Sequence, residues 1–368
     1  MSFYSVIERY SDFDIEEYFS GVTENMVLSS MRKENLSSKD FLNLLSPAAL
    51  PHLEEMARKA NKLTVQHFGR TISLYAPLYI SNYCTNHCTY CGFSVVNKIK
   101  RAQLTLEEID REAAEMAKTG LKHILLLTGE AKGITEISYL ADAIKVLKKY
   151  FSSVALEVFP MDEEEYRILK EAGADSLTIY QEVYDRDIYR EVHLKGGKAD
   201  YRYRLDTPER GAKAGLRAVN VGALFGLGEL ASEAFYSGLH AKYLMDKYLE
   251  TEVSISLPRI NPAEGGFQAK YTLGDRRFVQ FILAYRLFLP KVGINLSTRE
   301  TEEFRDNLLK LGITKFSAGS KTTVGGYNDK NQSTEQFDTS DKRSVEEIVA
   351  MIRSQGYQVV YKDWEAIW

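Results

Sequence analysis

Three cysteines within eight residues are the part of this sequence best suited to carry chemistry. Cys84, Cys88 and Cys91 lie in the segment NYCTNHCTYCGF with the spacing C-x3-C-x2-C, and the chain has no other cysteine. Thiolates this close together in sequence can bind one soft metal centre. With three thiolates and no fourth, a four-iron cluster held here would keep one iron free of protein thiolate, and that iron could bind a ligand.

Other interpretations of these cysteines remain open. A structural zinc site would need a fourth ligand, for which His87 within the motif or a distant histidine could serve, although such sites usually use paired cysteines. Three unrelated buried thiols would need no ligand at all. A non-catalytic metal-binding scaffold is a third alternative. A simple electron-transfer protein with a three-cysteine cluster would not require the eight β/α units described next.

The cysteines directly follow the first of eight short apolar runs that predict β-strands. The runs alternate with longer amphipathic stretches that predict helices, a pattern typical of parallel β/α units. Eight such units predict a TIM-type (β/α)8 barrel, with an open doubly wound sheet as the alternative, and barrel active sites lie where the strands end. The runs are residues 71–80, 122–128, 153–159, 175–181, 218–224, 252–258, 293–298 and 313–318.

Two further segments flank the expected barrel at residues 71–318. Residues 1–70 carry helical periodicity and predict an N-terminal helical extension. Residues 319–368 begin with a Gly-rich and polar stretch, continue with a helix at about 344–355, and contain a final strand in YQVVYK. We expect this C-terminal segment to cover one end of the barrel.

Composition excludes several classes of protein. The 368 residues are 44% hydrophobic and 27% charged, which suits a folded chain, and 47 Lys and Arg against 51 Asp and Glu give a net charge of −4. No basic field is present to bind nucleic acid. No apolar run approaches the length of a bilayer span, and acidic residues stand where a signal peptide needs cationic ones. We expect a cytoplasmic protein that binds neither nucleic acid nor membrane.

The cysteine motif, with aromatic Tyr90 before the third cysteine, resembles the signature of radical S-adenosylmethionine enzymes. Two later segments fit that superfamily: Thr128-Gly129-Glu130 after the second strand, and GALFGLGE, which contains Gly222 and Gly226, on the fifth. The resemblance implies one [4Fe–4S] cluster on three cysteines, with S-adenosyl-L-methionine chelated at the open iron. It also implies that Glu130 meets the amino group of this cofactor, and that Tyr90 and the two glycines belong to its binding site.

Longer segments resemble the 2-iminoacetate synthase (ThiH) family, the tyrosine lyases of thiamine biosynthesis. PLYISNYCTNHCTYCGFSVVNKIKR, SKTTVGGY and KDWEAIW are among them, and the resemblance covers almost the whole chain. It implies that a deoxyadenosyl radical takes hydrogen from the amino group of L-tyrosine, and that Cα–Cβ cleavage then yields 2-iminoacetate and p-cresol. It also implies thiazole synthase (ThiG) as a partner, and flavodoxin or a similar reductant.

Two related groups of enzymes compete with this assignment. The hydrogenase maturase HydG is similar but adds a C-terminal extension with further cysteines, whereas no cysteine follows Cys91 here. Tryptophan lyases cleave their amino acid by a similar mechanism and share the barrel fold.

Polar residues near the strand ends complete the expected cofactor site. Arg204, in YRYRLDTPER, could pair bidentately with the cofactor carboxylate, or it could be a solvated helix residue. Glu157 lies on an otherwise apolar strand, and Gln181 and Glu182 come at the end of the next one. Because buried ionised groups are costly without partners, we expect these side chains to face the barrel lumen or mouth.

The expected substrate site uses residues from the first, seventh and eighth strands. Tyr79 matches an aromatic hydroxyl that contacts the substrate amine in the related lyases, with a core tyrosine as the alternative. Arg299, in GINLSTRE, could hold the α-carboxylate of the substrate, or it could form a surface pair with a nearby glutamate. Ser317 and Ser320 are expected helpers, and His193 is a candidate base for the phenol.

Overall fold

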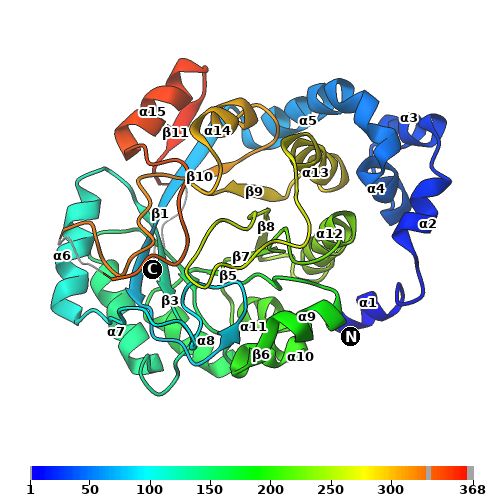
Figure 1. Ribbon diagram of the computed structural model, residues 1–368. Coiled ribbons are helices and arrows are strands. Elements are labelled where there is room, and N and C mark those ends of the chain that lie inside the picture. Colours follow the sequence, from blue (N-terminus) through cyan, green and yellow to red (C-terminus); the bar gives the residue numbers. More distant parts are fainter. Residues whose placement is uncertain (1, 329–332, 363–368) are drawn as a thin grey trace.

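Figure 1 shows a computed structural model of the chain, which describes residues 2–328 and 333–362. Its centre is a parallel β-barrel surrounded by helices. The barrel strands are β1 (Thr71–Ser81), β3 (His123–Thr128), β4 (Ser153–Glu157), β5 (Ser176–Thr178), β7 (Ala218–Gly222), β8 (Glu252–Ser256), β9 (Gly293–Leu296) and β10 (Lys315–Ser317).

The barrel closes between its first and last strands. Strand β10 pairs in parallel with β1, with Ser73 opposite Lys315 and Tyr75 opposite Ser317. This pairing confirms the (β/α)8 prediction and shows that the open-sheet alternative was wrong. A further strand, β11 (Gln358–Val360), pairs with the start of β1 and lies within the segment YQVVYK expected to form the last strand.

The helices that follow the strands present apolar faces to the barrel, and several of them begin at a side-chain cap. Thr105 and Asp162 each cap a helix within a reciprocal capping box. The helices around the barrel are α6 (Leu106–Ala117), α7 (Ile137–Leu147), α8 (Glu163–Glu171), α11 (Thr207–Lys213), α12 (Leu230–Lys247), α13 (Asp275–Phe288) and α14 (Glu302–Leu308). Shorter helices α9 (Arg186–Val192) and α10 (Tyr201–Leu205) lie between β5 and β7.

The residues before β1 are helical, as their periodicity predicts, and they pack on the outside of α12 and α13 (Figure 1). Phe41 stacks on Phe288 with ring centroids 4.3 Å apart. Gly238 faces the Phe41 ring, and a Cβ there would lie 2.5 Å from it, so the close approach requires glycine. The helices are α1 (Tyr4–Glu8), α2 (Ile15–Ser20), α3 (Glu24–Arg32), α4 (Ser38–Leu45) and α5 (Leu53–Phe68).

A layer of polar side chains crosses the barrel interior. The Asn220 side chain donates to Ser256 Oγ at 2.9 Å and accepts from Ser254 Oγ at 3.0 Å. Asn220, Ser254 and Asn295 line a cavity of about 620 Å³ toward the end of the barrel where the strands begin. The cysteines do not line this cavity, which separates it from the site described below.

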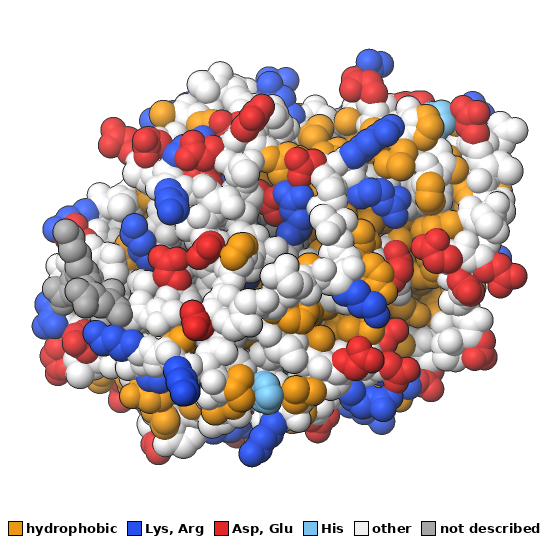
Figure 2. Space-filling model, viewed as in Figure 1, with side chains coloured by type: hydrophobic (Ala, Val, Ile, Leu, Met, Phe, Trp, Pro, Cys, Tyr) orange, Lys and Arg blue, Asp and Glu red, His pale blue; other side chains and the backbone are white. Residues whose placement is uncertain are grey.

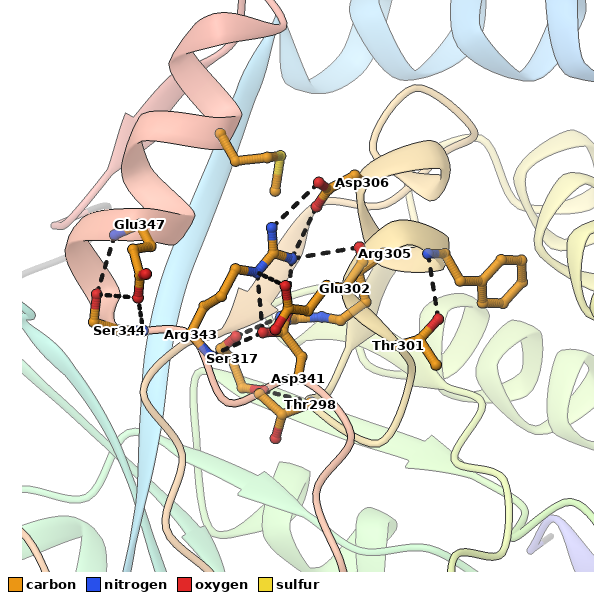
Figure 3. A network of polar contacts seen from close by, with 12 residues as sticks. Thr298, Thr301, Glu302, Arg305, Asp306, Ser317, Asp341, Arg343, Ser344 and Glu347 are labelled. Carbon is orange, nitrogen blue, oxygen red and sulfur yellow. Dashed lines mark hydrogen bonds and ion pairs between the residues drawn. The ribbon is translucent and has the colours of Figure 1, made fainter.

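Residues 333–341, here named the C-terminal strap, follow the last barrel strand and are fixed by a buried ion-pair network (Figure 3). Asp341 pairs with Arg305 and Arg343, and the side chains of Arg305 and Asp341 are fully buried. Arg305 also donates to the carbonyl of Ser317 at 2.5 Å. The backbone N–H groups of Ser340 and Asp341 donate to Thr298, which ties the strap to the ends of β9 and β10.

Helix α15 (Val345–Ser354) follows the strap, within the range expected from the sequence. Of the motif KDWEAIW, residues 363–368 lie outside the described residues. Within the described ranges, no helix combines the length and apolar character needed to cross a membrane.

The Asp341 network predicts a large loss of stability from a single substitution. Asp341→Ala would leave the buried Arg305 guanidinium without its counter-charge, which costs about 3–5 kcal/mol. The matched control is Asp306→Ala, because Asp306 pairs with the same Arg343 but its side chain is 31% exposed; we expect a loss below about 1 kcal/mol there. Urea unfolding of the three proteins gives both values, and equal losses would contradict the assignment.

Candidate active site

The cysteine loop continues directly from β1 and folds over the C-terminal end of the barrel. The short strand β2 (His87–Cys88) pairs with β6 (His193–Lys195), and the N–H of Val95 donates to the carbonyl of Asn86 at 2.8 Å. Arg101 closes the loop by donating to three backbone carbonyls, those of Asn82, Phe93 and Ser94. These hydrogen bonds hold the loop against the C-terminal end of the barrel.

Gly129 lets the turn after β3 approach this loop. A Cβ at Gly129 would lie 2.2 Å from the carbonyl oxygen of Tyr83, which no side chain can tolerate. The N–H of Thr85 donates to the carbonyl of Glu130 at 2.8 Å. The segment Thr128-Gly129-Glu130 is thus packed against the cysteines.

The three thiols line one cavity, here named the cysteine cavity, of about 100 Å³. Cys88 is buried and the other two are half-buried, and all three are free thiols. Among the described residues, no group of three or more His, Cys, Asp or Glu side chains is placed so that it could hold a single metal ion. Other expected residues that line this cavity are Tyr79, Glu130, Glu157 and Arg204.

The donor chemistry of the cysteine cavity fits an iron–sulfur cluster. Burial raises the pKa of Cys88 to about 12, against the opposing charge of Lys198, and burial also raises the pKa of Cys91. Cys88 and Cys91 of the free chain therefore hold their protons at neutral pH, and binding of iron must release them. Soft sulfur donors beside an acidic and a basic side chain suit a cluster together with a zwitterionic ligand.

Glu130 is held in position by the cysteine loop. Its Oε2 accepts from Asn86 Nδ2 at 2.7 Å, and the Asn86 carbonyl oxygen Oδ1 accepts from the N–H of Lys198 at 3.0 Å. Gly197 packs against Glu130, because a Cβ there would lie 2.1 Å from its Oε1. Asn86 had no signal of its own in the sequence.

Arg204 is buried, so the alternative of a solvated helix residue was wrong. Its Nη2 donates to Glu182 Oε1 at 3.1 Å and its Nε donates to the carbonyl of Tyr180 at 2.7 Å. Lys198 donates to the same Glu182 oxygen at 2.6 Å. Burial alone would raise the pKa of Glu182, but these two cations hold it below its usual value.

The backbone at Glu182 is constrained as well. It is the only non-glycine among the described residues with a positive φ, at 72°. Such left-handed backbone is uncommon for a residue with a Cβ and occurs at sites that the surrounding structure holds in place. Lys198 was missed from the sequence because a lysine in a Gly-rich loop resembles an ordinary surface residue.

A second cavity, here named the inner cavity, of about 70 Å³, adjoins the first. Both are lined by Tyr79, Leu127, Glu157 and Tyr180, which form a common wall. Arg299, Ser317 and Ser320 line only the inner cavity. The eight-stranded closure thus brings together residues from the first and last strands.

Arg299 is aimed inward and does not form the surface ion pair considered as its alternative. Its guanidinium carbon lies 3.4 Å from the centre of the Phe337 ring, and its Nη1 donates to the carbonyl of Arg259 at 3.3 Å. Glu300 instead pairs with Arg259. The Ser317 hydroxyl oxygen accepts from the N–H of Thr298 at 3.0 Å, and the Ser317 side chain also hydrogen-bonds to Tyr75, another residue of the inner cavity wall.

Tyr79 lies between the two cavities and donates its hydroxyl to Oε1 of Gln336 at 2.7 Å. It is buried, as the core alternative requires, and burial raises its pKa well above the usual value. Its ring makes an edge contact with Phe93, with centroids 5.9 Å apart. Gln336 and Phe337, both in the C-terminal strap, were not predicted, because nothing in a polar segment marks which side chains reach a site.

Three of the expected cofactor residues line neither cavity. Tyr90 directs its hydroxyl to His193 Nε2 at 2.8 Å, Gly222 packs against the Ser256 carbonyl, and Gly226 has a φ of 127°. Their contact with a cofactor stays a prediction. His193 Nδ1 donates to the carbonyl of Tyr189, so its Nε2 accepts from Tyr90, and this buried neutral imidazole is turned away from the inner cavity.

Comparison with known proteins identifies relatives over nearly the whole length. The Radical SAM superfamily model matches residues 78–234, and the Biotin and Thiamin Synthesis associated domain matches residues 256–358, which start at the end of β8. The chain is 41% identical to 2-iminoacetate synthase of Escherichia coli (strain K12) over 96% of this chain and 94% of that protein, and 40% identical to the Salmonella typhimurium enzyme over the same shares.

Solved structures of related proteins are also similar to this chain over nearly its whole length. A crystal structure of HydG, a maturase of the [FeFe]-hydrogenase, superimposes with a TM-score of 0.90 and 32% identity, over 94% of this chain and 78% of that one. The HydG of Carboxydothermus hydrogenoformans superimposes with a TM-score of 0.83 and 30% identity, over 98% of this chain and 82% of that one. Methylornithine synthase, at 22% identity and a TM-score of 0.75, shares the fold.

Glu157, in the common wall, is a carboxyl group whose pKa lies near neutrality. Burial and, secondly, the charge of Glu182 raise its pKa from 4.5 to about 7, and the opposing charge of Arg299 reduces this effect. The unfolded chain therefore releases this proton first as the pH rises. The contribution of Glu157 to folding stability therefore falls between about pH 4.5 and pH 7 and is constant above that range.

Glu157→Gln should remove this penalty. We expect the metal-free variant to be more stable than the parent protein at pH 8, by on the order of 2 kcal/mol because the side chain faces a cavity, and equal to it near pH 4. Chemical unfolding at both pH values measures this, with Glu164→Gln on exposed α8 as the control. The same stabilisation at pH 4 and pH 8 would show that ionisation is not its cause.

Proposed function

The chain belongs to the 2-iminoacetate synthases of the radical S-adenosylmethionine superfamily, and from this membership we propose that it cleaves the Cα–Cβ bond of L-tyrosine. The products are 2-iminoacetate and p-cresol, formed together with 5′-deoxyadenosine and methionine, for the thiazole part of thiamine. The observation that carries the proposal is the common wall of Tyr79 and Glu157, with three thiols on one side and the Arg299 guanidinium on the other.

The members of this superfamily use a [4Fe–4S] cluster and S-adenosylmethionine. When bound and reduced, this pair supplies a 5′-deoxyadenosyl radical, which no side chain can provide. In our proposal Cys84, Cys88 and Cys91 hold three irons, and the cysteine cavity holds the cofactor beside the fourth. Glu130, fixed by Asn86, accepts from its amino group, and Arg204 offers its remaining N–H groups to its carboxylate.

The inner cavity orients the amino acid. Arg299 donates two hydrogen bonds to the α-carboxylate, and its stacking on Phe337 fixes the plane of the guanidinium. The Tyr79 hydroxyl then lies on the cofactor side, where it meets the amine. Hydrogen abstraction needs a neutral amine, and the raised pKa of Glu157 limits the negative charge beside it at neutral pH. This orientation decides which hydrogen the radical reaches.

We also propose partners for this reaction in the cytoplasm: thiazole synthase, which would consume the unstable imine, and a flavodoxin-like one-electron donor. Support for a donor surface comes from Val95, Val96 and Leu194, whose side chains are about half exposed on the two sides of the strand that carries Cys88. Lys98 and Lys195 are exposed beside them. Figure 2 shows hydrophobic and cationic side chains together along the lower edge of the molecule, where β6 lies in Figure 1.

Product analysis tests the reaction. Anaerobic turnover with S-adenosylmethionine and tyrosine, reduced by dithionite or by flavodoxin, should give p-cresol and glyoxylate, the hydrolysis product of 2-iminoacetate. The Cys88→Ala variant should give neither these products nor 5′-deoxyadenosine, because the described fold offers no replacement thiol near the site. Carbon monoxide or cyanide as main products, or faster cleavage of tryptophan, would refute the assignment.

Arg299→Ala tests the substrate anchor. Loss of a charge-assisted pair to the carboxylate should weaken tyrosine binding roughly 10- to 100-fold. The cluster and cofactor binding should be retained, and the ratio of 5′-deoxyadenosine to p-cresol should rise because tyrosine is misplaced. Arg190→Ala, on the exposed face of α9, is the control. If the Arg299 variant binds and cleaves tyrosine like the parent protein, another group must hold the carboxylate.

A further inference from the structure

The side-chain amide of Gln336 touches both halves of the site. Its Oε1 accepts from the Tyr79 hydroxyl at 2.7 Å, and its Nε2 lies 3.9 Å from Cys91 Sγ, within reach of a long N–H to sulfur hydrogen bond. Tyr79 belongs to the wall of the inner cavity, whereas Cys91 belongs to the cysteine loop. One amide group therefore joins the residue we assign to the substrate amine with one assigned cluster ligand.

The chemistry of the two neighbours fixes which way the amide points. A cysteine that ligates iron has no proton and can only accept, so it must face the NH2 end of Gln336. The oxygen then faces Tyr79, whose raised pKa keeps its hydroxyl protonated and able to donate. The reverse orientation would place the amide oxygen against an anionic sulfur.

The backbone of the strap holds this amide without help from its side chain. The N–H of Gln336 donates to the Thr322 carbonyl at 3.1 Å, and the Thr322 hydroxyl donates to the Phe337 carbonyl at 3.0 Å. Gly92, next to Cys91, touches the same segment, because a Cβ there would lie 2.4 Å from the Gln336 carbonyl oxygen. The Gln336 side chain is therefore available to contact Tyr79 and Cys91, because backbone and Thr322 hydrogen bonds attach the strap.

We propose that Gln336 is a positioning residue that sets the reduction potential of the cluster and links it to occupation of the substrate site. Its N–H to Cys91 stabilises the added negative charge of the reduced state, which raises the potential. A substrate amine that donates to the Tyr79 oxygen strengthens the Tyr79–Gln336 bond, which polarises the amide and strengthens its bond to sulfur. Tyrosine binding therefore raises the potential further.

The first part of this inference needs only the cluster, whereas the second rests on the proposed substrate. The experiment is an electrochemical titration, monitored by electron paramagnetic resonance, of the reconstituted protein with S-adenosylmethionine, with and without tyrosine. Gln336→Leu should lower the potential and abolish the shift caused by tyrosine. Gln336→Glu should lower it at least as much, because it keeps an acceptor for Tyr79 but places a carboxyl beside the sulfur.

Two controls separate this role from a structural one. Gln268→Leu, on an exposed loop, should leave the potential and the tyrosine shift unchanged. Tyr79→Phe should abolish the tyrosine shift while largely retaining the potential of the substrate-free protein, since the amide still faces Cys91. Iron content and circular dichroism report whether each variant is folded and loaded.

The outcomes distinguish the two proposals. Unchanged potentials in both Gln336 variants, with normal iron content, would overturn the inference even if tyrosine is cleaved normally. A lowered potential with no response to tyrosine in the parent protein would retain the role at the cluster and remove the link to substrate. Failure of the parent protein to bind a four-iron cluster would refute the proposed function itself.

Discussion

The pairing of β1 with β10 determines where the functional residues of this molecule lie. Strand β1 carries Tyr79 and leads into the cysteine loop, while β10 carries Ser317 and leads into the C-terminal strap. Because these two strands are neighbours, residues more than 200 positions apart face the same two cavities. The hydrogen bond between Tyr79 and Gln336 is a direct result. An open sheet with the same strands would leave these segments at opposite edges.

Most of the buried charges around the site have an opposite charge beside them or can lose their own charge, and Arg299 is the exception. Glu182 is neutralised by Lys198 and Arg204, and Asp341 by Arg305 and Arg343. Glu157 faces the cavities and can be neutral near pH 7. Arg299 lies among aromatic and polar groups, and burial lowers its pKa. An unpaired buried cation of this kind is costly unless an anion arrives, which favours binding of a carboxylate.

The same arrangement separates structural from chemical roles within the C-terminal strap. Asp341 and the backbone N–H groups beside it attach the strap to β9 and β10. Phe337 and Gln336, only a few residues earlier, face Arg299 and Tyr79. A segment without regular secondary structure can position side chains this well because buried ion pairs and backbone hydrogen bonds hold it at several points.

The sequence by itself determined the eight β/α units, the helical start and the cysteine cluster, because strand and helix periodicity and ligand spacing are local properties. It also indicated Glu130, Arg299 and Tyr79, since each follows or ends an apolar strand and the ends of parallel strands meet at one face. Tertiary structure alone decided that Arg204 is buried against Glu182, that Lys198 completes this pair, and that Tyr90 faces His193. Gln336, Phe337 and Asn86 could not be predicted, because their roles depend on contacts with residues distant in sequence, and no local pattern records which polar side chain of a loop will meet such a partner.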